Sequence, residues 1–192
     1  MVRYIVYYFT ENVKKGSVVM HEKRNIHSKT KKIVIAALMT SLVCVATMLI
    51  KIPSPLKGYL NLGDGAVLVA GWMFSPVYGF LTAGLGSALA DLFSGYITYA
   101  LATFLIKGLM ALTVFACFKL LHGKLGNFAS QLIGGVLAEI LMVMGYFVFE
   151  GFLYGFAPSL INIPANAVQG VAGIILGMIL IRIFEKNDIV SL

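Results

Sequence analysis

Long apolar stretches separated by short polar or proline-containing breaks make up the chain from residue 33 onward. Most of these stretches match the ~20 residues that a helix needs to cross the apolar layer of a bilayer. Proline and glycine disfavour helix continuation, and they mark breaks at Pro53, Pro76, Gly95 and Gly123. The pattern predicts six helices, at about residues 33–52, 64–74 (a short one), 76–93, 98–121, 127–150 and 160–184.

Composition supports a membrane location. Hydrophobic residues make up 59% of the 192 residues and charged residues 12%, about half of the ~25% charged residues typical of soluble domains. A chain this short has too little interior to hide so much apolar surface from water, so a soluble domain and a disordered chain are both excluded. The sequence therefore predicts an all-α integral membrane protein with six transmembrane helices.

Basic residues indicate how the chain is oriented, because Lys and Arg gather on the cytoplasmic side of a membrane. With the N-terminus inside, twelve Lys and Arg fall on the cytoplasmic side and two on the outside, Lys51 and Lys57. Both termini are then cytoplasmic, and residues 53–63, the 3–4 turn and residues 151–159 face outward. We expect a multi-pass protein of the cell membrane.

The predicted organisation has three parts. Residues 1–31 form a basic cytoplasmic tail that we expect to be disordered, residues 32–186 form the membrane domain, and residues 187–192 form a second cytoplasmic tail. Met20 is an alternative start, which leaves open whether residues 1–19 belong to the native protein.

Polar side chains in three predicted helices repeat at helical spacing, so each set lies on one helix face. An ionisable group at membrane depth is costly unless it is paired or hydrated, which makes these residues informative. None of the three faces continues to the cytoplasmic side, so the pattern predicts a blind cup that opens outward and holds a small hydrophilic molecule. The sets are Tyr99, Thr103 and Lys107; Glu139, Tyr146 and Glu150; and Asn162, Asn166 and Gln169.

Several assignments stay open at this point. Lys107 and Glu139 lie at similar depth, so they either pair with each other, as an internal salt bridge, or contact a ligand. The amide face of the last helix either binds a ligand or hydrogen-bonds between helices. Asp91 either joins the site or caps the following turn, Asp64 is placed to cap the second helix, and the loop around Asn61 can fold over the cup.

Three segments resemble the substrate-binding S components of energy-coupling factor (ECF) vitamin transporters, over roughly residues 33–185. They are Tyr59-Leu-Asn-Leu-Gly-Asp-Gly65, Ser75-Pro-Val-Tyr-Gly79 and Gly84-Leu-Gly-Ser-Ala-Leu-Ala-Asp-Leu-Phe-Ser-Gly-Tyr96. The stretch from Ala37 to Ser41 also resembles the small-xxx-small motif that these proteins present to a transmembrane coupling subunit, with Ser41 in place of the usual Ala.

The resemblance implies an S-component-like bundle that binds a vitamin from outside and delivers it inward with a coupling subunit and two ATPases. In this family the first outer loop and the last three helices usually form the pocket, and the polar faces fall on the same elements. The chain looks most like members assigned to pyridoxine-type or hydroxymethylpyrimidine substrates. The expected site residues are Asn61, Tyr99, Thr103, Lys107, Glu139, Tyr146, Asn162, Asn166 and Gln169.

Two alternatives remain, a riboflavin-binding S component and a self-sufficient secondary transporter, although no internal repeat is visible. An enzyme is disfavoured because the sequence has no nucleophile–His pair and no metal-ligand cluster. We expect no metal and no cofactor, and no nucleic acid as a partner. The sequence has no Walker motif, so ATP hydrolysis would occur in a partner.

Overall fold

The structure is a computed structural model, and it describes residues 30–54 and 58–186. The chain divides into two compact units, residues 1–37 and residues 38–192. In the first unit the described residues, 30–37, are helical. The predicted tails at residues 1–31 and 187–192, and Met20, lie outside the described residues, apart from Thr30 and Lys31.

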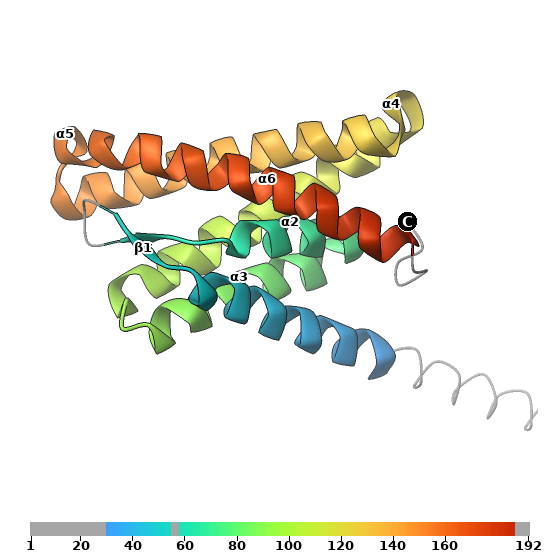
Figure 1. The fold of residues 1–192 in the computed structure, drawn as a ribbon, viewed down its shortest axis with the longest axis horizontal. Helices are drawn as coiled ribbons and strands as arrows, with labels where there is room; N and C mark the ends of the chain where they lie inside the picture. Colours follow the sequence, from blue (N-terminus) through green and yellow to red (C-terminus); the bar gives the residue numbers. More distant parts are fainter. Residues whose placement is uncertain (1–29, 55–57, 187–192) are drawn as a thin grey trace, which may run out of the picture. The chain divides into compact units, whose positions relative to one another are not determined.

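Helices make up most of the described chain (Figure 1). α2 and α6 agree with the predicted apolar segments to within a few residues, α3 has the predicted bounds, and α4 joins the predicted fourth and fifth helices. A two-stranded antiparallel sheet follows the first helix, with Ile52 paired with Leu60. The elements are the helix Thr30–Leu49, β1 Ile52–Pro53, β2 Tyr59–Leu60, α2 Gly63–Met73, α3 Pro76–Phe93, α4 Ile97–Tyr154, α5 Phe156–Ser159, η1 Leu160–Asn162 and α6 Ile163–Lys186.

The predicted break near Gly123 is wrong by three residues. The helix runs through His122, whose ring stacks on Phe118 and whose Nδ1 lies 3.0 Å from the Phe118 carbonyl oxygen. The chain turns instead at Gly126, where φ is 76° and ψ is 171°. Glycine adopts a positive φ without the steric cost that other residues meet. The two arms of α4 on either side of this turn correspond to the predicted fourth and fifth helices (Figure 1).

The predicted loop at residues 151–159 is largely helical. α4 continues to Tyr154, and the chain turns at Gly155, where φ is 95°. The short helices α5 and η1 then lead directly into α6. The loop prediction is wrong because the glycine and aromatic residues of this segment do not interrupt the helix. One positive-φ glycine is enough to redirect the chain.

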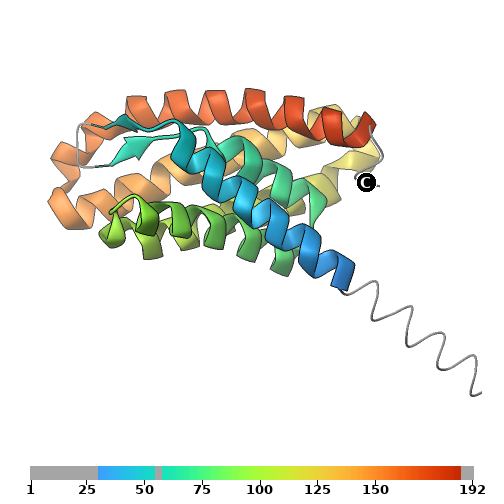
Figure 2. The same cartoon turned by 60° about the horizontal axis from the view of Figure 1, so that its bottom comes forward.

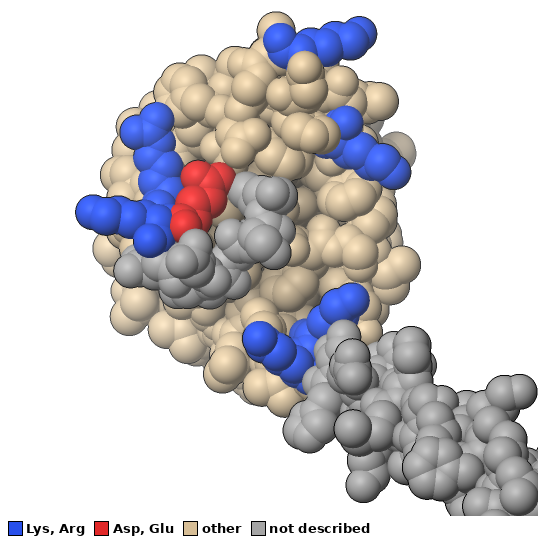
Figure 3. Space-filling view, turned by 90° about the vertical axis from the view of Figure 1, so that its right-hand side faces the viewer, with Lys and Arg blue, Asp and Glu red and all other residues tan. Residues whose placement is uncertain are grey.

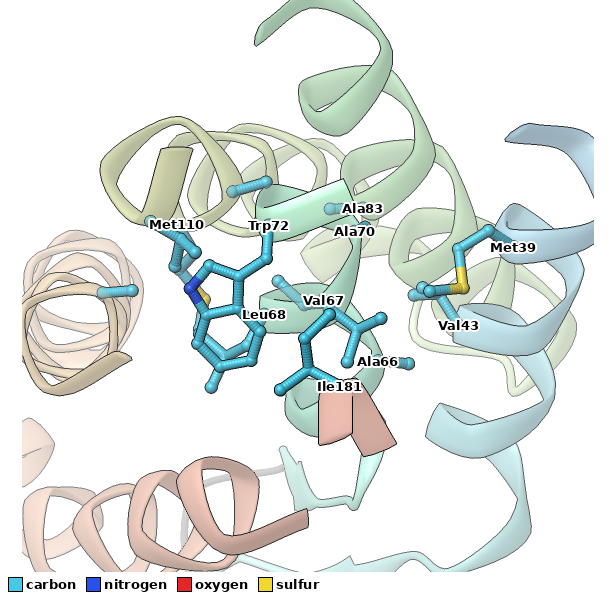
Figure 4. Close-up of a cluster of buried hydrophobic side chains, with 14 of the residues drawn as sticks. Met39, Val43, Ala66, Val67, Leu68, Ala70, Trp72, Ala83, Met110 and Ile181 are labelled. Atoms are coloured by element: carbon cyan, nitrogen blue, oxygen red, sulfur yellow. The ribbon is translucent and has the colours of Figure 1, made fainter. Parts of the chain in front are cut away.

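α2 occupies the centre of the second unit. Every residue of α2 except Met73 is buried, and the helix packs against α3, α4 and α6. Val67, Leu68 and Trp72 contribute to a cluster of buried apolar side chains that also includes Met110 of α4 (Figure 4). Apart from Asp64, α2 is apolar on all sides, because every face of the helix contacts protein.

Polar and apolar side chains are distributed in the reverse of the pattern found in a soluble protein. Leu101 and Val168 are 72% and 66% exposed, whereas Lys107 and Asp64 are 1% and 0% exposed. An apolar exterior around buried charges is what a lipid environment favours. By length and composition, three helices within the described residues can cross a membrane: Thr30–Leu49, Ile97–Tyr154 and Phe156–Lys186.

The connections are sorted between the two ends of the second unit. The β1–β2 hairpin, the α3–α4 turn and α5 lie at one end (Figures 1 and 2). The turn within α4 and the C-terminal end of α6 lie at the other. Figure 3 shows this second end, with Lys and Arg side chains spread around it. The three connections that the sequence predicts to face outward are thus grouped together.

Candidate functional site

A cavity of about 30 Å³ lies beside the β1–β2 hairpin, among both arms of α4, α3 and α6. Its wall combines hydroxyl groups, amides, three charged side chains and tyrosine rings. The lining residues are Thr47, Ser54, Gly58, Tyr59, Asn61, Ser87, Asp91, Tyr96, Tyr99, Thr103, Lys107, Tyr146, Glu150, Asn166 and Gln169.

An ion pair between Lys107 of α4 and Asp64 of α2 borders this cavity, and both side chains are buried. Gln169 of α6 donates from Nε2 to Asp64 Oδ2 at 2.7 Å. The Gln169 Oε1 atom accepts a hydrogen bond from the Asn61 backbone N–H at 2.8 Å. The network therefore joins α2, α4 and α6 and connects the segment after β2 to them.

Asp64 does not cap α2 as predicted. The Asn61 side chain accepts a hydrogen bond from the Gly63 N–H at 2.9 Å instead, because an Asn side chain reaches a backbone N–H two residues on. Asp64 sits in the first helical turn and turns its carboxylate towards Lys107. Lys107 therefore pairs with Asp64 rather than with Glu139.

The hairpin is attached to α3 by a second set of contacts. The Tyr59 hydroxyl donates to Asp91 Oδ1 at 2.7 Å, and the Tyr59 ring lies 4.6 Å from the Tyr96 ring, centroid to centroid. Nearby, Lys51 Nζ donates to Ser94 Oγ at 2.7 Å. Burial, followed by the charge of Asp91, raises the pKa of the Tyr59 hydroxyl well above its usual value, so Tyr59 stays a hydrogen-bond donor.

The first and second arms of α4 face each other across the cavity. Thr103 Oγ1 and the Tyr146 hydroxyl lie 3.1 Å apart, and Lys107 Nζ lies 5.5 Å from the centre of the Tyr146 ring. An ammonium group at that distance is attracted to the negative face of an aromatic ring. The side chains of this region are therefore held in fixed positions by one another.

Glu150 forms a further buried cluster. Both of its carboxylate oxygens accept hydrogen bonds from Asn162 Nδ2 at 2.9 Å, and Tyr99 donates to Oε1 at 3.3 Å. Asn162 contacts the cavity through Glu150 and is not itself one of the lining residues.

Seven of the nine predicted ligand-binding residues line this one cavity: Asn61, Tyr99, Thr103, Lys107, Tyr146, Asn166 and Gln169. Glu139 does not. It lines a separate apolar groove with Ile140 and Ala167, and its carboxylate oxygens have no hydrogen-bond partner among the residues that the structure describes. The predicted partner-contact residues, Ala37 and Ser41, are both exposed.

Eight of the residues that line the cavity are not among the predicted ligand-binding residues: Thr47, Ser54, Gly58, Tyr59, Ser87, Asp91, Tyr96 and Glu150. Ser87 and Asp91 are four residues apart on α3, a spacing that places them on one helix face and that is a signal for both in the sequence. Tyr59 was assigned only to a covering loop, and Asp64 was assigned to a helix end.

A membrane-type helical bundle with a buried polar cavity beside a β-hairpin is typical of a receptor for a small solute. The family model for the S component of ECF-type riboflavin transporters matches residues 27–186. The chain belongs to this family of ECF S components, which is a family of transporter subunits and not of enzymes.

Two relatives are similar over most of their length. An uncharacterized protein of Pyrococcus woesei, "in gap 3'region", is 39% identical over 146 residues, which cover 76% of this chain and 95% of that protein. The thiamine precursor transporter HmpT of Lactococcus lactis subsp. cremoris (strain MG1363) is 26% identical over 167 residues, which cover 84% of this chain and 92% of HmpT.

Solved structures agree with the fold. The S component of a bacterial ECF transporter has a TM-score of 0.66 and 25% identity, covering 82% of this chain and 97% of that one. The S component for biotin from an ECF-type ABC transporter has a TM-score of 0.61 and 21% identity, covering 83% and 93%. The architecture is thus that of S components.

Proposed function

We propose that this chain is the substrate-capture subunit of an ECF-type ABC importer. It binds a small water-soluble aromatic vitamin or vitamin precursor from outside and delivers it inward with partner ATPases. The observation that carries the proposal is the convergence of tyrosine rings, amides and charged groups on one cavity. Rings such as Tyr99 and Tyr146 can stack on a heteroaromatic ligand, and the amides of Asn166 and Gln169 can bond its hydroxyl groups.

Hydroxymethylpyrimidine and pyridoxine-like compounds are the substrates that we favour. HmpT, a thiamine precursor transporter, is similar to this chain over most of its length. The cavity measures about 30 Å³, whereas drug-sized ligands occupy pockets of roughly 300–1,000 Å³. A one-ring ligand therefore requires less displacement of the hairpin and side chains than a three-ring flavin. Riboflavin remains the second candidate because the family model carries its name.

The proposal includes six membrane crossings with both termini cytoplasmic. This orientation is supported by the basic residues, because it places twelve Lys and Arg on the cytoplasmic side and two on the outside. The grouping of the three predicted outer connections at one end also supports it. The small residues Ala37 and Ser41, on the exposed side of the first helix, are proposed to contact the transmembrane coupling subunit, which would work with two ATPase subunits.

A ligand panel tests the substrate class. The full chain, purified in detergent, is heated with pyridoxine, pyridoxal, hydroxymethylpyrimidine, thiamine or riboflavin. A ligand that binds only the folded protein stabilises it, by about 2.7 kcal/mol at a concentration one hundred times its Kd. This stabilisation raises the melting temperature. We expect hydroxymethylpyrimidine or pyridoxine to give the largest shift. If no compound shifts the transition, the proposed ligand class is wrong.

Reconstitution tests the mode of transport. Proteoliposomes containing this chain, with or without a coupling subunit and two ATPases, are loaded with ATP and supplied with radiolabelled ligand. We expect accumulation only in the complete assembly. Accumulation by the chain alone would favour the secondary-transporter alternative, which no partner ATPase drives.

A further inference from the structure

Asp91 and Ser87 present unused hydrogen-bonding groups at the cavity wall. They lie one helical turn apart on α3, both line the cavity, and they are 4% and 1% exposed. Asp91 Oδ1 accepts from Tyr59, but Asp91 Oδ2 and Ser87 Oγ have no hydrogen-bond partner within the described part of the chain. Buried polar atoms are almost always paired, so two unpaired ones on the same wall point to a ligand.

The charges around the cavity favour one kind of ligand. Three charged side chains line the cavity: Asp91 and Glu150 are acidic, and Lys107 is basic. Because Lys107 is already paired with Asp64, its charge is balanced before any ligand arrives. A buried site that retains carboxylates attracts a positive or N–H-bearing group and repels a phosphate or carboxylate.

The carboxylates of Asp91 and Glu150 differ in how many of their oxygen atoms already accept hydrogen bonds. Both oxygens of Glu150 already accept from Asn162, and Tyr99 adds a third donor. Asp91 Oδ2 has no hydrogen-bond partner at normal distance within the described residues, although the Thr103 side chain also interacts with the Asp91 carboxyl group. The bond from Tyr59 to Oδ1 fixes the orientation of the carboxylate. Asp91 is therefore the carboxylate that is oriented in advance for a new donor.

We propose that Asp91 and Ser87 form the subsite that recognises an amino group on a heteroaromatic ligand, with Asp91 Oδ2 accepting from the amine. The inference rests on the proposed function and narrows it. The chain selects an amine-bearing ring over a ring without the amine, and it rejects the phosphate ester of the same ring. Tyr59 acts as a positioning residue for Asp91.

Calorimetric binding to the purified full chain tests the subsite. The probes are hydroxymethylpyrimidine, the analogue with hydrogen in place of its exocyclic amine, and its phosphate ester. We expect the amine to increase the affinity by roughly ten- to one-hundred-fold, as a hydrogen bond to a charged group does. We expect the phosphate ester to bind more weakly than hydroxymethylpyrimidine by at least a similar factor.

Variants assign the effect to Asp91. Asp91→Asn keeps the shape and an acceptor for Tyr59, so it should remove most of the preference for the amine. Glu150→Gln makes the same charge change in the same cavity, but it should weaken both neutral ligands by a similar factor. Ser87→Ala is a milder variant that should lower the amine preference a few-fold. It tests the same subsite if Asp91→Asn does not give a folded, monodisperse protein.

The outcomes separate this inference from the proposed function. If the native chain binds the two neutral probes equally well, or if Asp91→Asn and Ser87→Ala weaken both to the same extent, the subsite is refuted while the vitamin-capture function stands. The same holds if pyridoxine binds and hydroxymethylpyrimidine does not. If none of the panel compounds binds, the proposed function fails as well.

Discussion

Replacing Lys107 with Met tests whether the buried ion pair holds the helices together. Lys107 and Asp64 are 1% and 0% exposed, so removing the ammonium leaves the Asp64 carboxylate in the protein interior with only the Gln169 amide as a donor. Breaking a buried pair by removing one partner costs about 3–5 kcal/mol. A loss of this size is a large part of a typical stability of about 5–15 kcal/mol.

The assay is thermal unfolding of the full chain in detergent, followed by tryptophan fluorescence and by the monodisperse fraction that remains after heating. Lys107→Met should lower the transition temperature markedly. The double variant Lys107→Met/Asp64→Asn should recover most of the loss, because it removes both charges together. Lys119→Met is the matched control: Lys119 is exposed on the same helix, and an exposed charge contributes little.

The reasoning is refuted if the two substitutions simply add. A double variant that is less stable than Lys107→Met would mean that Asp64 is stabilised by its other contacts, and that the pair does not determine how α2 packs against α4.

Three further outcomes follow from the structure. Asn166→Leu keeps the side-chain volume and removes the amide that lines the cavity, so vitamin affinity measured by calorimetry should fall at least ten-fold; unchanged affinity would exclude α6 from the site. Glu139→Gln should leave that affinity nearly unchanged, because Glu139 lines the separate groove. Gly173→Ala places a Cβ 2.7 Å from Asp64 Cβ and should destabilise the fold by about 1–3 kcal/mol in thermal unfolding. Gly123→Ala, with nothing within 4 Å of the new Cβ, should not.

Helical spacing was sufficient to find much of the site. Tyr99, Thr103 and Lys107 were grouped because they recur every fourth residue, and all three line the cavity. Glu139 was grouped by the same rule, yet it faces the groove beside Ala167. The spacing defines one face of a helix, but which neighbour that face meets depends on how the helices pack, and this is a tertiary property that periodicity does not contain.

The partner of Lys107 was not predictable from the periodicity of its own helix. Asp64 lies 43 residues away, and its place at a helix start made a local cap the simpler interpretation. The environment of Trp72 likewise depends on tertiary packing. Its side chain lies near the end of α2 and is 3% exposed within the apolar cluster, because α2 is surrounded by other helices.

The enclosed position of α2 has a consequence for how the protein is made. The helix has 11 residues, a length of about 16 Å at 1.5 Å per residue, or roughly half the thickness of the apolar layer. During synthesis it is too short to leave the translocon as a stable span alone. The carboxylate of Asp64 has its ion pair with Lys107 and its hydrogen bond from Gln169 only after these later residues are synthesised. Insertion of this segment therefore depends on residues not yet translated, and a nascent chain stalled before residue 107 should expose it to quality-control proteases.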